Sequence, residues 1–266
     1  TAYKDFDSVM MRDSAYKDAE ARKAEALETG LFTIALMKFE NGSYRHNIHT
    51  KISSYVEQQL MASEDPFLKV VDRESLEMIL QEQELELSGL TSGAELEVGA
   101  LLGAKAILKG TVVECSNSSS QLRHENKRGF EKYRVEKINA EGKKYYETKY
   151  RPATYREYYR NSVSKITLSL KLVSMETGTV LSAVTVSASQ TDNIRYIVYN
   201  GNKNNLYPER LGGAVDMSSS GHLQLMSLIN ARKDLINEST LIDQSAKIIS
   251  SKVLVEVESI MIDIIK

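Results

Sequence analysis

Residues 70–83 read VVDRESLEMILQEQ, which places a cluster of charged side chains directly after two valines. The apolar run that ends here, FLKVVD at 67–72, has the length of a buried strand. Beyond it, Leu76 and Leu80 fall on one face of a helix. Asp72 would then lie between a strand and a helix, where its carboxylate can accept from the free backbone N–H groups of the first turn. We interpret Asp72 as a helix cap rather than as a catalytic acid.

Strand and helix patterns alternate on both sides of this stretch. Strand-like runs occupy residues 31–39, 67–72, 104–115, 164–175 and 179–189. Apolar residues at helical spacing follow the first of them at 48–61, and Thr240 with Asp243 has the spacing of a capping box that opens a C-terminal helix. The pattern predicts an α/β fold: a mixed sheet of about five strands, flanked by helices and followed by a long C-terminal helix.

The remaining segments define the expected domain organisation. Residues 1–30, rich in charges of both signs, predict a helical N-terminal tether that stops at Gly30. Residues 31–266 would form the α/β domain. Two polar segments, at about 115–161 and 190–221, would be irregular hairpin insertions into it.

The first insertion is basic and rich in tyrosine. Residues 116–161 hold twelve Lys or Arg, six Glu and seven of the fourteen tyrosines. Interleaved cations and aromatic rings can stack on single-stranded nucleic acid, but the glutamates interrupt the run and no recognition motif is present. We therefore expect no nucleic-acid partner, and either a plain solvated hairpin or a contact with a protein or an envelope polymer. The candidate contact residues are Tyr145, Tyr146, Tyr150, Tyr155, Tyr158, Tyr159, Arg151 and Arg156.

Motifs for chemistry are weak throughout the chain. His46 and His49 lie three residues apart, but no other ligands with zinc-site spacing accompany them. Cys115 ends an apolar run and is expected to be a small buried side chain. Neither a phosphate-binding glycine loop nor a nucleophile motif is present. We expect no catalytic residue, no metal and no cofactor, and we expect that the chain is not an enzyme.

The order of the segments resembles one known family. FTIALMKFEN, then FLKVVDRESLEMILQEQELELSGLTS, then ELEVGALLGAKAILKGTVVE, then the hairpin LKLVSMETGTVLSAV are similar to the curli production assembly/transport family, the CsgG-like proteins. The resemblance covers roughly 31–114 and 162–189. It implies a periplasmic α/β domain, associated with the outer membrane through a lipid anchor removed from this chain. It also implies a homo-oligomer, possibly a ring, and other envelope proteins as partners.

The resemblance leaves three roles open. The leading expectation is a non-enzymatic envelope lipoprotein that oligomerises or scaffolds an outer-membrane-associated assembly or secretion machine. The second is a secretion channel subunit that exports unfolded protein through a β-barrel built from the two insertions. The third is a periplasmic activator of a peptidoglycan synthase. The insertions favour the first over the second, because a cation that faces lipid at mid-bilayer costs about 2–4 kcal/mol.

Overall fold

The computed structural model describes residues 2–13, 16–71 and 103–265. The helix expected after residue 71, with its cap Asp72, therefore lies outside the described residues. The strand expected before it is present. It is β3 (Leu68–Val71), which pairs in parallel with β1 (Phe32–Leu36).

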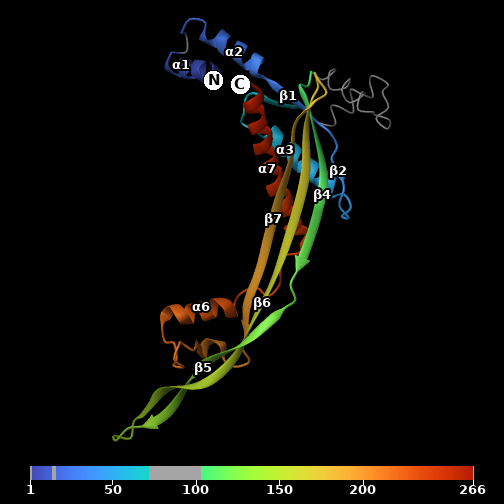
Figure 1. Ribbon diagram of the computed structural model, residues 1–266. Coiled ribbons are helices and arrows are strands. Elements are labelled where there is room, and N and C mark those ends of the chain that lie inside the picture. Colours follow the sequence, from blue (N-terminus) through green and yellow to red (C-terminus); the bar gives the residue numbers. More distant parts are fainter. Residues whose placement is uncertain (1, 14–15, 72–102, 266) are drawn as a thin grey trace. The chain divides into compact units, whose positions relative to one another are not determined.

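The expected α/β class is confirmed: helices flank one mixed sheet (Figure 1). The other strands are β2 (Glu40–Asn41), β4 (Ala106–Ser119), β5 (Arg123–Ile138), β6 (Lys144–Ser174), β7 (Val180–Val198) and β8 (Leu206–Pro208). Strand β1 is parallel to β3 and β4, and β5 is antiparallel to β6. The five expected strands correspond to β1, β3, β4, β6 and β7. The described part of the chain adds β2, β5 and β8, which makes the sheet eight-stranded.

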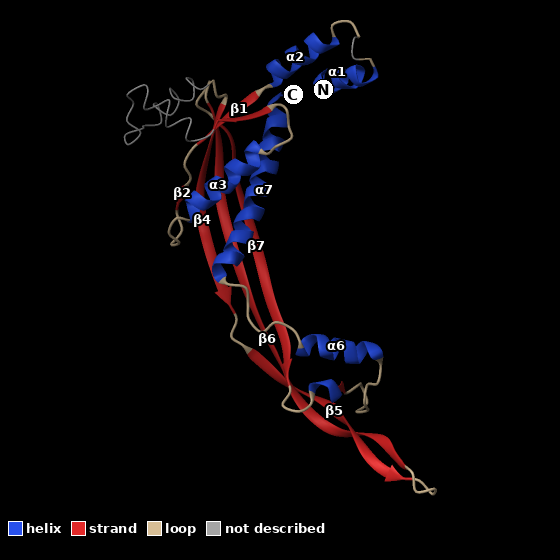
Figure 2. Ribbon diagram, turned by 180° about the vertical axis from the view of Figure 1, so that it is seen from behind, coloured by secondary structure: helices blue, strands red, loops and turns tan. Residues whose placement is uncertain are grey.

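Two helices share one core with the sheet. Helix α3 (Ile48–Met61) buries Ile48, Ile52, Val56 and Leu60, as the helical spacing predicts. Helix α7 (Glu238–Ile265) lies against α3, and hydrogen bonds link it to α3 and to the residues just after α3. The hydroxyl of Tyr55 donates to the Asp243 carboxylate at 2.6 Å, and that of Ser63 donates to the Glu258 carboxylate at 2.7 Å. Figure 2 shows both helices beside the strands.

Helix α7 differs from expectation at its start and on one face. It begins at Glu238, and the Asn237 carboxamide oxygen accepts from the Thr240 backbone N at 2.8 Å. Asn237, not Thr240, therefore caps this end, because the helix begins before Thr240. The apolar stripe is also narrower than it looks in the sequence. Ile248, Val255 and Ile262, spaced seven apart, are 37%, 64% and 53% exposed.

The N-terminal segment forms two helices instead of one, α1 (Ala2–Arg12) and α2 (Ala19–Gly30). Gly30 does not end α2 through a left-handed conformation, since Leu31 follows it with extended geometry. Its role is steric: a Cβ on Gly30 would lie 2.6 Å from the ring of Phe67. The glycine thus allows the ring to approach the helix closely.

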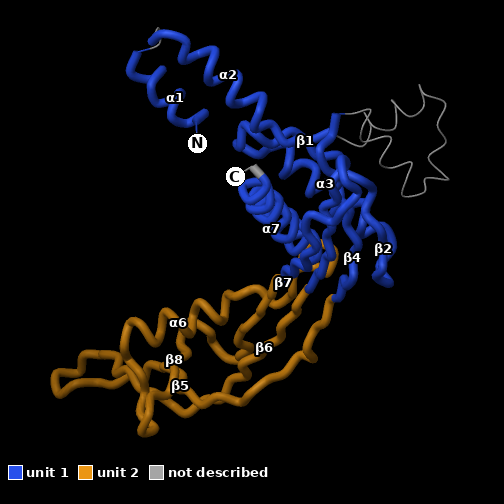
Figure 3. Tube along the Cα trace, turned by 45° about the horizontal axis from the view of Figure 1, so that its top comes forward, with its two compact units in different colours: residues 1–116, 165–189, 242–266 blue, residues 117–164, 190–241 orange. Residues whose placement is uncertain are grey.

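The chain divides into two compact units (Figure 3). Unit 1 holds residues 1–116, 165–189 and 242–266, and unit 2 holds residues 117–164 and 190–241. The core of unit 1 is formed by the sheet with α3 and α7, and Ile34, Ile52, Ile166 and Ile249 in it are fully buried.

The first polar insertion is more regular than expected. Strands β5 and β6 pair without interruption over sixteen positions, from Arg123 opposite Tyr159 to Ile138 opposite Lys144. A turn stabilised by Asn139, whose side chain accepts from the backbone N of Lys143 at 2.8 Å, joins them. A hairpin is present, but it is an ordered ribbon because every residue in this run has a cross-strand partner.

The second polar segment is not a hairpin. Strand β7 continues to Val198, and a short 3₁₀ helix, η2 (Lys203–Asn205), leads into β8. Strand β8 pairs with β5, so that Tyr207 lies opposite Phe130 and Leu206 opposite Glu131. Helix α6 (Ser219–Ile229) follows, with Ser218 as its N-cap. Pairing with a strand distant in sequence takes the place of a local turn.

Candidate partner-contact surface

The β5–β6 ribbon has two chemically different faces. Side chains alternate along each strand, and directly paired residues share a face. In this register every pair joins two odd-numbered or two even-numbered residues. We call the even-numbered residues from 124 to 138 and from 144 to 158 the even face, and the odd-numbered residues from 123 to 137 and from 145 to 159 the odd face.

The odd face carries the core of unit 2. Tyr155 is only 7% exposed and packs with Ile197, Leu206, Leu225 and Ile229. The latter two bring α6 onto this face. Space for the tyrosine ring comes from a glycine on the same face, Gly129, where a Cβ would lie 3.0 Å from Tyr155 Cε1 and 2.6 Å from the Tyr207 carbonyl oxygen. Tyr155 was expected to be a contact residue, but it is a core residue because its strand position points toward α6.

Ion pairs neutralise most of the odd face. Arg151 binds the Glu131 carboxylate through Nε at 3.0 Å and Nη2 at 2.6 Å. That bond, with smaller contributions such as the Asn202 backbone N–H, holds the pKa of Glu131 below its ordinary value. Arg195 of β7 similarly pairs with the buried Glu157. Arg151 thus satisfies a carboxylate of its own chain, although its side chain is largely exposed.

The even face carries a chain of aromatic contacts. The ring of Tyr150 meets that of Tyr207 edge-on at 5.5 Å, and Tyr207 stacks on His222 of α6 at 4.6 Å. Further along, Tyr158 stacks on Tyr196 of β7 at 5.1 Å and lies 5.2 Å from the ring of His124. The rings of Tyr150 and Tyr158 therefore serve largely as internal packing, and both residues are only partly exposed.

The structure leaves four of the eight candidate contact residues open to solvent with limited internal pairing. Tyr145, Tyr146 and Tyr159 are 47%, 62% and 37% exposed. Arg156 is exposed and donates through Nη1 to the Tyr158 hydroxyl at 3.3 Å. The first two tyrosines lie at the tip of the ribbon, whereas Tyr159 and Arg156 lie near its base.

Residues from the second polar segment, from α6 and from the segment after α6 complete this surface, and the sequence did not mark them as contact residues. Tyr207 meets the ring of Tyr150, Tyr196 stacks on Tyr158, and His222 stacks on Tyr207. The buried carboxylate of Asp192 forms an ion pair with Arg232 and also accepts a hydrogen bond from the backbone N of Ile236 at 2.7 Å. These contacts hold the segment after α6 against β7. In the sequence, the one local indication of these contacts was that aromatic and charged residues recur within a segment otherwise rich in turn residues.

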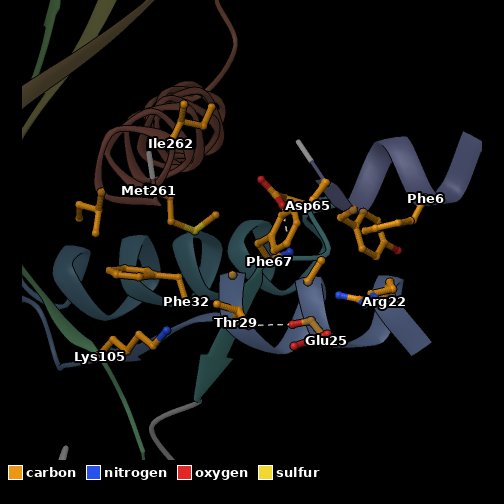
Figure 4. A pocket seen from close by; sticks show the side chains of 15 residues that line it. Phe6, Arg22, Glu25, Thr29, Phe32, Asp65, Phe67, Lys105, Met261 and Ile262 are labelled. Atoms are coloured by element: carbon orange, nitrogen blue, oxygen red, sulfur yellow. Dashed lines mark hydrogen bonds between the residues drawn. The ribbon is translucent and has the colours of Figure 1, made fainter. Parts of the chain in front are cut away.

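Unit 1 contains a separate pocket of about 890 Å³ (Figure 4). Its wall is formed by α1, α2, the start of β1 and the end of α7, and it is largely apolar, with Phe6, Phe32, Phe67 and Met261 around it. The ring of Tyr3 meets that of Phe67 edge-on at 5.4 Å, and Lys23 pairs with Asp7 across the two helices.

The described residues contain neither a group of metal ligands nor a helix suited to cross a membrane. No three His, Cys, Asp or Glu side chains there gather into a group that could hold a metal ion. His46 and His49 thus have no further ligands among the residues described. In the same part of the chain, no helix has both the length and the hydropathy to cross a membrane.

Comparison with known proteins gives a family match for part of the chain. Residues 16–122 match the family model described as curli production assembly/transport component CsgG. The CsgG-like resemblance expected from the sequence is thereby confirmed for that part of the chain, which includes β1, α3, β3 and β4. A search of curated proteins finds no match.

Solved structures show weaker similarity. Lipoprotein GNA1162 from Neisseria meningitidis is 13% identical, with 60% of this chain and 83% of that chain covered and a TM-score of 0.36. The LpoB C-terminal domain from Escherichia coli is 12% identical, with 60% of this chain and 83% of that chain covered and a TM-score of 0.36. The PelC dodecamer from Paraburkholderia phytofirmans is 12% identical, with 85% of this chain and 87% of that chain covered and a TM-score of 0.31. With TM-scores below 0.5, these similarities carry no argument about function.

Proposed function

We propose that this chain is a non-enzymatic component of the cell envelope that oligomerises and scaffolds an assembly or secretion machine at the outer membrane. In this proposal it is a periplasmic lipoprotein, the N-terminal helices tether it, and unit 2 contacts the partner. The observation that carries the proposal is the CsgG match over residues 16–122.

The arrangement of the described residues supports this division of roles. The matched segment provides most of the strands and helix α3 of a well-packed core in unit 1. Such a core can make unit 1 a stable platform, but it does not itself provide a surface for a partner. Unit 2 instead presents a long ribbon whose tip exposes Tyr145, Tyr146 and Ile138, the last at 65%. Exposed aromatic and aliphatic side chains among charges are typical of surfaces that bind other macromolecules.

The alternative of a secretion channel subunit has one observation in its favour. Strands β5 and β7 have 16 and 19 residues, more than the roughly 9–11 residues that cross a bilayer. Charge argues against it. The even face exposes Arg128, Arg134 and Arg156, and the odd face holds Glu131 and Glu157 in ion pairs. Neither face offers an apolar band to lipid.

Conductance across a planar lipid bilayer tests the proposal against this alternative. The purified full chain is added to bilayers with a known pore-forming protein as the positive control. We expect no steps in conductance above the buffer background, since a scaffold does not open a pore. Stable conductance steps that depend on the protein concentration would overturn the scaffold and favour the channel.

A further inference from the structure

Charge is distributed unequally between the two faces of the β5–β6 ribbon. The even face carries Arg128, Lys132, Arg134, Lys144 and Arg156 against a single acid, Glu136. The odd face carries Arg123, Lys127, Lys137, Lys149 and Arg151 against Glu125, Glu131, Glu147 and Glu157. The excess positive charge of the insertion therefore lies mainly on one face, although the sequence shows only an overall basic segment.

Several cations on the even face are available to a ligand. Arg134 is exposed and forms no ion pair with any residue that the structure describes. Arg128 has a side chain 80% exposed and reaches Glu209 only at 3.6 Å. Arg156 bonds to a neutral hydroxyl, that of Tyr158. The one ribbon glutamate of the even face, Glu136, pairs with Lys144 at 2.7 Å, and each of the four glutamates on the odd face has a cation within 4.0 Å.

The aromatic rings on the even face are less available than the cations. A nucleic-acid base needs a free ring face on which to stack. One face of Tyr158 is occupied by Tyr196, Tyr150 is packed against Tyr207, and Tyr207 is stacked on His222. Among the even-face tyrosines of the ribbon, only Tyr146, at the tip, is more than half exposed. The face therefore presents guanidinium and ammonium groups, with few rings open to bases.

We propose that the even face binds an acidic segment of a partner protein in extended conformation, an inference that rests on the scaffold function proposed above and names its partner chemistry. Guanidinium groups match carboxylates in a bidentate geometry. Side chains on one side of an extended chain repeat every two residues, about 6.6 Å. Arg134 and Lys132 repeat along β5 with the same period, so acidic residues at alternate positions of the partner meet successive cations.

Binding of a defined acidic peptide to the full chain tests this proposal. The probe is a fluorescein-labelled peptide of alternating glutamate and serine, and its neutral match replaces each glutamate by glutamine. Fluorescence anisotropy is recorded at low and at physiological salt. We expect the acidic peptide to bind and the neutral one not to, with an affinity that falls as salt rises.

Two double variants with the same change in net charge separate the faces. The even-face variant is Arg134→Gln with Arg156→Gln, and the odd-face control is Arg123→Gln with Lys149→Gln. All four side chains are exposed. Because each exposed ion pair contributes little and the even-face variant removes two cations, it should weaken peptide binding by about twofold to thirtyfold. The control should change it by less than about twofold, through long-range charge alone.

The competing ligands give outcomes that contradict the proposal. Equal losses in both variants, or no binding of the acidic peptide to the unaltered chain, would overturn it. Preferential binding of polygalacturonate, of vesicles with phosphatidylglycerol, or of a single-stranded oligonucleotide at equal charge concentration would overturn it too. The mass of each protein in solution is measured in parallel. An oligomer that fails to bind the peptide refutes only this inference, and a monomer that binds it refutes only the proposed assembly.

Discussion

Asp192 shows how a single residue holds unit 2 together. It is 5% exposed, its carboxylate pairs with Arg232, and it accepts from the backbone N of Ile236 at 2.7 Å. A buried carboxylate without such partners would be strongly unfavourable. The pair therefore fixes the segment that follows α6, far along the chain from β7.

Substitution Asp192→Asn should destabilise the protein. The amide keeps the size of the carboxylate but loses the charge-assisted bonds, so we expect a loss of about 1–3 kcal/mol in the free energy of unfolding. Urea denaturation followed by far-UV circular dichroism measures it. Asp234→Asn, an exposed neighbour, is the control and should change the free energy by less than about 0.5 kcal/mol. An equal effect of the two substitutions would contradict the role assigned to Asp192.

The Asp192–Arg232 pair should also make the free energy of unfolding depend on pH. The hydrogen bond from Arg232 holds the pKa of Asp192 below its ordinary value of 3.8, against the opposing effect of burial. A lowered pKa in the folded state adds stability that is present above the unfolded value and is lost as pH falls through the folded one.

We therefore expect the stability gap between the unaltered chain and the Asp192→Asn variant to narrow below about pH 5. Denaturation midpoints at a series of pH values measure this gap. It should be largest near neutrality, where the Asp192 carboxylate is ionised in both the folded and the unfolded protein. A gap that is constant down to pH 3 would show that the substitution acts through packing and not through charge.

Helix α6 is the element that gives the odd face its core. It places Leu225 at 4% exposure and Ile229 at 6% against Tyr155 and Leu206, while Leu223 on its other side is 67% exposed. Without this helix the ribbon would have an apolar patch in water. Packing of α6 therefore covers the apolar side chains of the odd face.

Leu225→Ala tests that packing, with Leu223→Ala on the same helix as the matched control. Removing a buried leucine leaves a cavity, so the free energy of unfolding should fall by about 2–4 kcal/mol. The exposed leucine should contribute less than about 0.5 kcal/mol. Similar values for the two variants in urea denaturation would mean that α6 does not pack on the ribbon as described.

Elements with an apolar face were predictable from the sequence, whereas the ribbon was not. Ile48, Ile52 and Val56 marked α3 because burial imposes the helical period. Strand β5 has no comparable signal, since its odd residues are mostly charges that pair across the strands. Regular polar strands therefore looked like an irregular insertion.

The candidate site was predicted only in part, for a related reason. Composition placed Tyr146 and Tyr155 equally on a contact surface, yet their exposures are 62% and 7%. Register decides between them, and register depends on pairing with distant residues. Tyr207 was missed because its ring meets that of Tyr150, which is distant in the sequence, and His222 was missed because it takes part only by stacking on Tyr207.

At the scale of the whole molecule, the proposal assigns different tasks to the two units. Unit 1 contains residues 16–116 of the segment that matches the CsgG model, and unit 2 presents the charged ribbon. A scaffold requires that several copies associate, since one copy offers one ribbon and several offer a repeated surface. Multiple weak contacts can then add up to strong binding.

The mass of the full chain in detergent-free solution tests this account most directly. One chain has a mass of 29.9 kDa. Light scattering coupled to size-exclusion chromatography, over a range of loading concentrations, should give a discrete species at a fixed multiple of that mass. A single species at the mass of one chain, unchanged at the highest concentration, would contradict the assembly function.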